Sequence, residues 1–374
     1  MIRFIHSSDL HLGKRFGHLG GDLPGRLREA RHGVLSRLAG HARDTGAETI
    51  LLAGDTFDTE TPAPDIRRQA LVEMARHAPI RWVILPGNHD SLQASQLWAS
   101  LKAEAPPNVI LAVEARPIEL GGRAVLLPAP CTTRRPGRDL TEWMDAAATP
   151  EGTLRIGLAH GPIQSFSEEG SGADILAPDR ARRAGLDYLA LGDWHGAMTV
   201  DPRTRYSGAP EPDRFKHDRP GEALLIRLDA PGALPEAASL PTASFSWRVL
   251  ELHLMNGEDA VGTLASRLPP PDARRQTLVQ LSVTGTVRLA DRTALLEAVA
   301  HAVPEFAHLA LDAEGLISEC EVEDLDRIDR AGALREAADA LLRRSEDAGL
   351  AGSEREIARA ALARLYALSQ TVAA

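Results

Sequence analysis

Cysteine, basic charge and long apolar runs are all scarce in this chain of 374 residues. The two cysteines, Cys131 and Cys320, lie far apart and follow no metal-ligand spacing. One disulfide between them is conceivable, but two thiols in a reducing cytosol are favoured. No apolar run approaches the roughly 20 residues that span a bilayer, and the N-terminus turns polar too early for a signal peptide. These absences predict a soluble, cytoplasmic protein without a membrane segment.

The shortage of basic charge excludes one class of partner but not another. With 42 Lys and Arg against 52 Asp and Glu, the net charge is −10, which rules out a globally basic nucleic-acid coat. Nucleic acid remains open as a substrate, because a site that holds cations with carboxylates is acidic until its metals are counted. The length predicts two domains, or one large domain with appendages.

The first half of the chain alternates short apolar runs with segments of helical spacing. Strands are expected at residues 2–5, 49–53, 82–85, 124–127, 154–158 and 188–191, and helices at 26–45 and 66–76. Strands that alternate with helices indicate a layered α/β architecture.

The second half changes character after one more strand, expected at 221–229. Residues 230–246 have little periodicity and suit a linker or an irregular edge. A small α+β module follows, and then two helices are expected between 334 and 368. The predicted division is a main domain at 1–232, an α+β domain at 245–330 and a helical segment at 331–374.

Polar motifs follow the predicted strands of the first half. They are Asp9-Leu10-His11, Gly54 to Asp58, Gly87 to Asp90, His160-Gly161 and Gly192 to Gly196. Ligand sites of open α/β folds lie at the carboxyl ends of strands, so these side chains are expected to converge. Glycines beside the polar residues allow the sharp turns that convergence requires.

The residue types in these motifs suit two divalent metal ions. Carboxylates, an amide oxygen and imidazoles, with no thiolate, fit manganese, iron or zinc. Two such ions about 3.5–4 Å apart can clamp a phosphate ester, generate a hydroxide and stabilise the leaving oxygen. A carboxylate must bridge ions that close together, and Asp55 is the natural candidate.

The strings SSDLHLG, GDTFD, PGNHD, AHGP and LGDWHG, in this order, resemble the calcineurin-like metallophosphoesterase superfamily. Within it, HSSDLHLGK and the later YSGAPEPDRF are most similar to SbcD-type DNA repair exonucleases and their Mre counterparts. The motifs run from Asp9 to about Phe215, over half the chain. The resemblance implies a four-layer α/β/β/α sandwich with a smaller α+β capping domain and C-terminal helices.

The resemblance also implies a set of metal ligands. Asp9, His11 and His195 would hold the first ion, with Asp55 bridging to a second. Asn88 and His160 would hold that second ion.

One ligand position departs from the family pattern of Gly-His-x-His. This chain has Gly192-Asp193-Trp194-His195, which puts Asp193 where a histidine ligand of the second ion is expected. Aspartate can bind the same ion, and its charge favours a harder metal such as manganese.

Other residues would act around the metals. The resemblance implies that His89 contacts the scissile phosphate or protonates the leaving oxygen, and that Asp90 orients His89. Asp58 suits a cap of the following turn better than a support for a ligand.

Basic residues near the motifs are the predicted contacts to DNA phosphates. The best placed follow the motifs directly: Lys14, Arg15, Arg214 and Lys216. Other arginines near the motifs, among them Arg134, Arg135 and Arg138, are individually expected to be solvated.

The predicted function is metal-dependent hydrolysis of DNA phosphodiester bonds, by an exonuclease of DNA repair that uses a two-metal hydroxide mechanism. Mn²⁺ is favoured over Fe²⁺ or Zn²⁺. The alternatives are a phosphoesterase of small esters or cyclic nucleotides, and a catalytically weak subunit that binds DNA ends. The resemblance further implies a homodimer and an SMC-like coiled-coil ATPase of the SbcC type docked on the C-terminal helices. Those helices could equally pack on their own domain.

Overall fold

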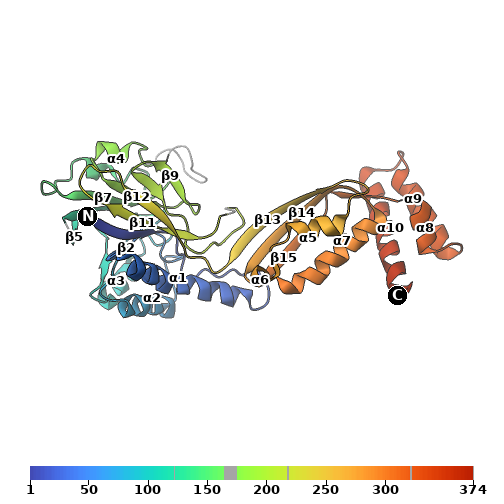
Figure 1. Cartoon of the computed structure of the whole chain (residues 1–374), viewed down its shortest axis with the longest axis horizontal. Helices are drawn as coiled ribbons and strands as arrows, with labels where there is room; N and C mark the ends of the chain where they lie inside the picture. The colour runs from blue at the N-terminus through green and yellow to red at the C-terminus, as the bar shows by residue number, and fades with distance from the viewer. Residues whose placement is uncertain (122, 164–174, 217–218, 321, 374) are drawn as a thin grey trace. The chain divides into compact units, whose positions relative to one another are not determined.

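The computed structural model describes residues 1–121, 123–163, 175–216, 219–320 and 322–373. The chain divides into two compact units, Met1–Ser246 and Trp247–Ala374 (Figure 1). Within the described ranges, none of the helices combines the length and apolar character needed to cross a membrane. Neither cysteine is in a disulfide; Cys131 is buried and Cys320 half-buried.

The first sheet of the first unit contains six strands in the order β12-β11-β1-β2-β3-β4. Their bounds are β1 Ile2–Ser7, β2 Thr49–Leu52, β3 Arg81–Ile84, β4 Val109–Leu111, β11 Glu222–Leu228 and β12 Glu236–Pro241. The strands β1 to β4 are parallel, whereas β11 and β12 join antiparallel at one side. The carboxyl ends of β1, β2 and β3 therefore share one edge.

The second sheet also has six strands, in the order β5-β6-β7-β8-β10-β9. Their bounds are β5 Ile118–Gly121, β6 Ala124–Ala129, β7 Leu154–His160, β8 Tyr188–Gly192, β9 Met198–Asp201 and β10 Thr204–Tyr206. The strands β6, β7, β8 and β10 run parallel.

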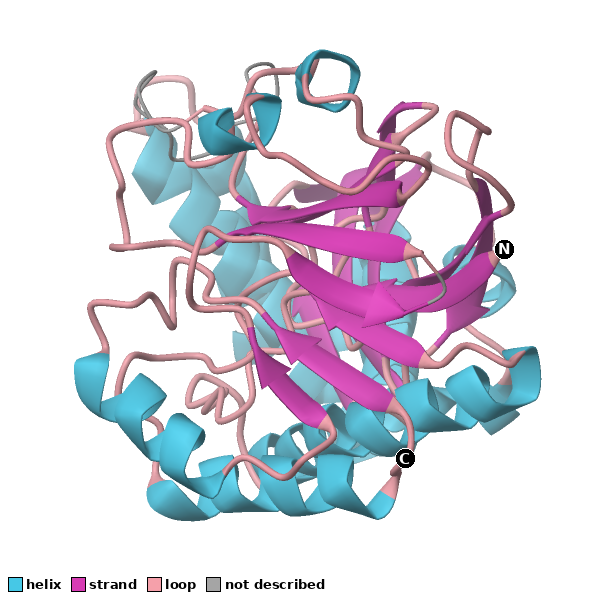
Figure 2. Ribbon diagram, turned by 90° about the vertical axis from the view of Figure 1, so that its left-hand side faces the viewer, coloured by secondary structure: helices cyan, strands magenta, loops and turns pink. Residues whose placement is uncertain are grey.

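The two sheets stack face to face, with helices against their outer faces (Figure 2). Successive side chains of a strand point to opposite faces of the sheet, so the first sheet contributes to two hydrophobic cores. Phe4 and Leu51 pack between the two sheets, whereas Ile50 packs against the helices. The helices α1 (Leu23–Thr45), α2 (Pro64–Arg76) and α3 (Ser95–Glu104) cover the first sheet. Only η1 (Glu142–Asp145), α4 (Arg180–Arg183) and loops cover the second among the described residues. The predicted four-layer α/β/β/α fold is confirmed.

The helix α1 illustrates how local sequence sets an element. The helix begins at Leu23, three residues before the start that the sequence predicts. A proline in the first turn favours this start, because a helix leaves the N–H groups of its first turn unbonded and proline has none. Leu27, Val34 and Leu38 form the buried stripe. The helix ends at Gly46, whose left-handed φ of 70° lets its N–H reach the carbonyls of Ala42 and Arg43.

The segment expected as a linker or an irregular edge forms an edge of the first sheet and belongs to the first unit. Residues 236–241 form β12, which pairs with β11, and Thr242 donates its N–H to the Gly221 carbonyl at 3.0 Å. The buried Glu211 carboxylate then accepts the N–H groups of Ser244 and Phe245. Because of these bonds the first unit extends to Ser246, beyond the predicted domain boundary at residue 232.

The second unit combines a four-stranded sheet with helices. Its strands are β13 Ser246–Leu254, β14 Thr277–Arg288, β15 His308–Asp312 and β16 Leu316–Glu319. Its first helices are α5 Ala260–Arg267, α6 Pro271–Arg274, α7 Leu289–Ala302 and η2 Val303–Glu305. The last are α8 Val322–Ile328, α9 Ala333–Glu346 and α10 Gly352–Ala373. The capping domain and the separate helical segment stay predictions.

Candidate metal centre

The loops after β1 and β2 run side by side and carry the first candidate ligands. The Asp9 N–H bonds the Gly54 carbonyl at 3.1 Å, and the His11 N–H bonds the Asp55 carbonyl at 2.9 Å. This backbone ladder continues the sheet beyond the strand ends. It therefore places Asp9 and His11 beside Asp55, although the whole of α1 separates the two loops along the chain.

Four of the predicted metal ligands have left-handed backbones. The φ angles are 56° at Asp9, 44° at His11, 51° at Asp55 and 102° at Asp193. Such angles are uncommon for residues other than glycine, and each costs on the order of 1–3 kcal/mol. The surrounding packing holds this strain at the point where the side chains are aimed.

The side chains of the motifs meet at the shared edge of the two sheets. Asp9, His11 and His195 form one group able to hold a metal ion, and Asp9, Asp55 and His160 form another. Asp55 Oδ2 lies 3.6 Å from His11 Nε2 and 3.5 Å from His160 Nε2. Asp55 thus lies between His11 of the first group and His160 of the second, and its role as the bridging carboxylate stays a prediction.

The three imidazoles at this edge all present Nε2 to the centre. The Nδ1 atom of His160 bonds the Ala53 carbonyl at 2.8 Å, and that of His195 bonds the Asp213 carboxylate at 3.0 Å. His11 Nδ1 lies 3.2 Å from Asp58 Oδ1. Because the Ala53 carbonyl and the Asp213 carboxylate accept hydrogen bonds from Nδ1–H, the Nε2 lone pairs of His160 and His195 are left for a metal.

The Asn88 amide and His160 each leave a buried polar atom without a hydrogen bond. Asn88 Nδ2 donates to Asp193 Oδ1 at 3.0 Å, whereas Asn88 Oδ1 and His160 Nε2 have no hydrogen-bond partner among the described residues. A buried polar atom without a partner costs about 1–3 kcal/mol. An amide oxygen and an imidazole nitrogen are both ligand atoms for divalent ions, so the residues present fit a metal.

Two carboxyl groups of the centre have perturbed pKa values. Burial alone would raise the pKa of Asp55, but the charges of the imidazoles, His160 first, hold it below its usual range. Burial raises the pKa of Asp193 to about 6, and the charges of Asp9 and Asp55 add to this effect. The crowding of carboxylates creates a strong demand for positive charge in the centre.

Glycines are required where the loops approach one another. A Cβ atom on Gly87 would lie 2.2 Å from Asp55 Oδ1, and one on Gly54 would lie 2.3 Å from His160 Nδ1. Gly54 also has a left-handed φ of 90°. No other residue fits these positions without displacing a ligand.

His89 lies beside the centre, but its predicted support differs from the observed one. Its Nδ1 bonds the carbonyl oxygen of Asp58 at 3.0 Å, and its backbone N–H donates to Asp55 Oδ1 at 2.8 Å. The Asp90 carboxylate instead accepts the N–H groups of Gly87 at 2.7 Å and Phe57 at 3.0 Å. The expectation that Asp90 orients the His89 ring is therefore wrong: Asp90 holds the backbone of the turn.

Asp58 also differs from its prediction as a simple turn cap. Its carboxylate faces His11 and its carbonyl fixes His89, so it supports two imidazoles at once. The sequence could have indicated this only through the string GDTFD, in which the second aspartate follows the bridging one closely.

Asp213 is a site residue that sequence reasoning missed. Its buried carboxylate accepts from His195 Nδ1 at 3.0 Å, Lys14 Nζ at 2.7 Å and Arg214 Nε at 3.1 Å. Burial opposes ionisation, but the hydrogen bond and charge of His195, with Arg31 and Lys14, hold the pKa of Asp213 well below its usual range. Its only signal in the sequence is its place in YSGAPEPDRF.

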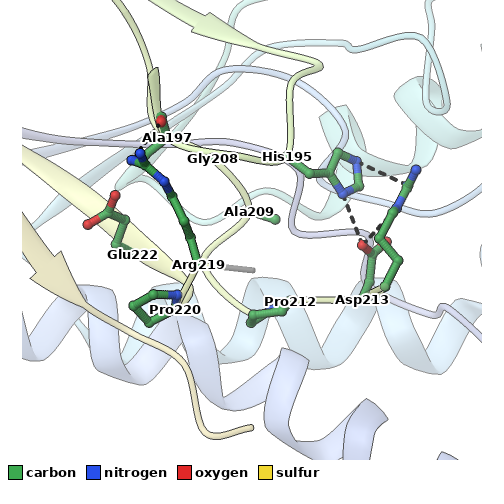
Figure 3. A pocket seen from close by; sticks show the side chains of 10 residues that line it. His195, Ala197, Gly208, Ala209, Pro212, Asp213, Arg219, Pro220 and Glu222 are labelled. Atoms are coloured by element: carbon green, nitrogen blue, oxygen red, sulfur yellow. Dashed lines mark hydrogen bonds and ion pairs between the residues drawn. The ribbon is translucent and has the colours of Figure 1, made fainter. Parts of the chain in front are cut away.

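The predicted phosphate contacts fall into two groups. Lys14 and Arg214 are bonded to Asp213, whereas Arg15 and Lys216 are exposed at the surface. A small pocket adjoins them, with His195 and Asp213 on one wall and Arg219 and Glu222 on the other (Figure 3). The roles of all four basic residues in substrate binding stay predictions.

A sandwich of two parallel-rich sheets, with carboxylates and imidazoles gathered at one edge, defines the class of metal-dependent phosphoester hydrolases. Residues 2–197 match the calcineurin-like phosphoesterase family, and the chain belongs to that family. Its members hydrolyse phosphoester bonds with divalent metal ions, for which the described residues supply ligand groups.

Individual relatives cover parts of the chain. The SbcD component of the nuclease SbcCD of Bacillus subtilis (strain 168) is 32% identical over 94 residues, which make up 24% of this chain and 22% of that protein. The crystal structure of TT1561 of Thermus thermophilus aligns with 13% identity and a TM-score of 0.40, covering 64% of this chain and 98% of that one.

Proposed function

We propose that this phosphoesterase hydrolyses the phosphodiester bonds of DNA, as an exonuclease of DNA repair. The observation that carries the proposal is the convergence of three Nε2 atoms, the Asp9 and Asp55 carboxylates and the orphaned Asn88 oxygen at one sheet edge. The similarity to a component of a nuclease supports DNA as the substrate class.

The proposed ligand sets follow the two groups of side chains. Asp9, His11 and His195 would hold one ion, Asn88, His160 and Asp193 the other, and Asp55 would bridge. When bound, two divalent ions supply a nucleophile from water and stabilise charge on the phosphate and the leaving oxygen. Mn²⁺ is the proposed metal, ahead of Fe²⁺ or Zn²⁺, because Asp193 gives the second set an additional hard oxygen.

His89 is the proposed proton donor to the leaving oxygen. The proton on its Nδ1 is committed to the Asp58 carbonyl at 3.0 Å, so exchange with substrate takes place at Nε2. Its backbone N–H meanwhile holds Asp55 Oδ1, which fixes the bridging carboxylate relative to the same residue. One residue thus positions a ligand and carries the proton.

The proposed partners are DNA, a second copy of the chain and an SMC-like ATPase of the SbcC type. The relative is one component of a larger nuclease, which supports an assembly. Four apolar residues of the C-terminal helices pack with α7 and α8 within the second unit: Leu341, Leu342, Leu362 and Leu365. Ile357 is 68% exposed, and docking is therefore proposed at its face of α10.

The proposed function is tested by Mn²⁺-dependent degradation of single- and double-stranded DNA, with bis-p-nitrophenyl phosphate as the small ester. His89→Ala and Asp193→His are assayed beside the wild type, and bound metal is counted for each. DNA cleavage that His89→Ala abolishes, with two ions retained, is the expected result.

Two other outcomes would contradict the proposal. Hydrolysis of the small ester without DNA cleavage would indicate a small-substrate phosphoesterase. No turnover and about one ion per chain, with both restored by Asp193→His, would indicate a DNA-end-binding subunit with a weakened centre.

A further inference from the structure

The loop at residues 132–138 begins directly beside the candidate metal centre. It follows β6, whose last residue Ala129 is in register with Ala159 of β7, next to His160. The Cys131 N–H bonds the Pro86 carbonyl at 3.1 Å, and the Leu92 N–H bonds the Cys131 carbonyl at 2.9 Å. The start of the loop is therefore fixed against the segment that carries Asn88 and His89.

The other end of the loop is fixed by Asp139. Its carboxylate accepts from the Ala177 N–H at 3.0 Å, from Arg180 Nη2 at 2.8 Å and from the Thr141 N–H at 2.8 Å. These bonds neutralise the acid that follows the loop. The intervening residues are thus tethered at both ends but project into solvent.

The loop carries three arginines and no acid, in the sequence TTRRPGR. Arg134, Arg135 and Arg138 are all exposed, and within the described ranges none makes a hydrogen bond or ion pair. Several exposed arginines elsewhere on this unit have a carboxylate partner, as Arg182 has in Asp179. In a chain of net charge −10, three guanidinium groups without acidic partners among the described residues concentrate positive charge on a loop that begins beside the centre.

The loop is better placed for this role than two of the residues expected from the sequence. The ammonium of Lys14 lies 2.7 Å from the Asp213 carboxylate, and Arg214 Nε lies 3.1 Å from it. A cation already bonded to a buried carboxylate gives less binding energy to a phosphate than an unpaired one. The loop therefore offers the phosphate backbone cations that have no acidic partner among the described residues.

We infer that Arg134, Arg135 and Arg138 bind successive backbone phosphates of a polynucleotide strand beyond the scissile bond. The inference rests on the proposed function and adds a subsite to it. Arg138 follows Arg134 by four positions, so their Cα atoms lie at most about 13 Å apart, and the loop offers three cations rather than one. The loop therefore selects a polymer over a small phosphate ester.

Binding of a fluorescein-labelled oligothymidine to the full chain tests the inference, by anisotropy in EDTA across a salt series. The triple variant Arg134→Ser/Arg135→Ser/Arg138→Ser loses the loop cations. The charge-matched control replaces three exposed arginines that have acidic partners: Arg68, Arg116 and Arg182. Both variants are also assayed for Mn²⁺-dependent hydrolysis of bis-p-nitrophenyl phosphate.

The loop variant is expected to bind at least tenfold more weakly at low salt, with a salt slope smaller by about 2 (roughly 0.7 for each phosphate contact). The control should keep both values, and both variants should hydrolyse the small ester as the wild type does. Unchanged binding in the loop variant, or equal losses in the control, would overturn the inference. Loss of small-ester hydrolysis in the loop variant alone would overturn it too, since the loop would then support the centre itself.

The outcome also separates this inference from the proposed function. A wild type that binds the strand through the loop but never cleaves it would refute the nuclease and leave the subsite standing. A wild type that cleaves DNA, with binding unaffected in the loop variant, would support the nuclease and refute the subsite. A wild type that does not bind the strand would overturn the inference.

Discussion

Single polar groups behind the ligands determine which atoms face the centre. Asp213 holds His195, the Ala53 carbonyl holds His160, and Asp58 faces His11. These groups need not touch a metal to matter, because the hydrogen bonds to His195 and His160 fix the ring orientation and the position of the Nδ1 proton. The chemistry of the edge therefore depends on residues that the motif strings do not single out.

Asp213→Asn is expected to weaken metal binding about 10–100-fold, the usual effect of removing such a support. The amide keeps the size of the side chain but loses the charge that His195, Lys14 and Arg214 share. Titration of Mn²⁺ against a competing fluorescent chelator measures the change. The control is Asp187→Asn, a buried carboxylate bonded to Arg155 and Gly232 N–H groups away from the centre. Equal affinities in the two variants would argue against a supporting role.

Loops at strand ends, rather than the strands themselves, account for most of the precision of the centre. The strands supply direction and burial, while the left-handed turns at Asp9 and Asp55 aim the side chains. Gly87 allows the loop after β3 to lie directly on Asp55. The loops touch at this point, so one methyl group added at Gly87 has no room.

Gly87→Ala is expected to lower the free energy of unfolding by about 1–3 kcal/mol, as overpacking of a tight contact does. The new Cβ would lie 2.2 Å from Asp55 Oδ1 and 2.3 Å from its backbone nitrogen. Gly25→Ala in α1 is the matched control; nothing lies near its Cβ, and it should gain up to about 1 kcal/mol in helix propensity. The midpoints of urea unfolding measure both changes in stability. A Gly87→Ala protein as stable as the wild type would contradict the steric argument.

At the scale of the whole molecule, the end of the first unit is set by long-range pairing. Glu211, far along the chain from α1, accepts from Ser244 and Phe245 and pairs with Arg37 at 2.8 Å. The strand β12 adds a row of backbone hydrogen bonds to β11. A buried carboxylate left without these partners would be costly.

A chain cut after residue 246 is therefore expected to fold and to hydrolyse bis-p-nitrophenyl phosphate, whereas one cut after residue 232 should unfold at clearly lower urea. The shorter chain exposes the edge of β11 and leaves Glu211 without its two backbone donors. Circular dichroism in urea compares the two, with the full chain as reference. Equal midpoints would show that the segment after residue 232 contributes nothing to the unit.

The sequence by itself determined the layered α/β class and the positions of most strands, because buried parallel strands are read directly as short apolar runs. It also indicated the motif residues, since their types and order are local. It could not find α8, a helix of seven residues, or the edge strand β12, whose pairing with β11 is tertiary.

Only the tertiary structure decided how the site residues act on one another. Asp90 bonds backbone N–H groups rather than His89, and Asp213 reaches His195 and Lys14 from a different loop. The three arginines of the 132–138 loop are distinguished by their lack of acidic partners among the described residues, which no local pattern reveals. The sequence gives the type of each residue directly, whereas the hydrogen-bond partner of that residue depends on which distant segments the fold brings together.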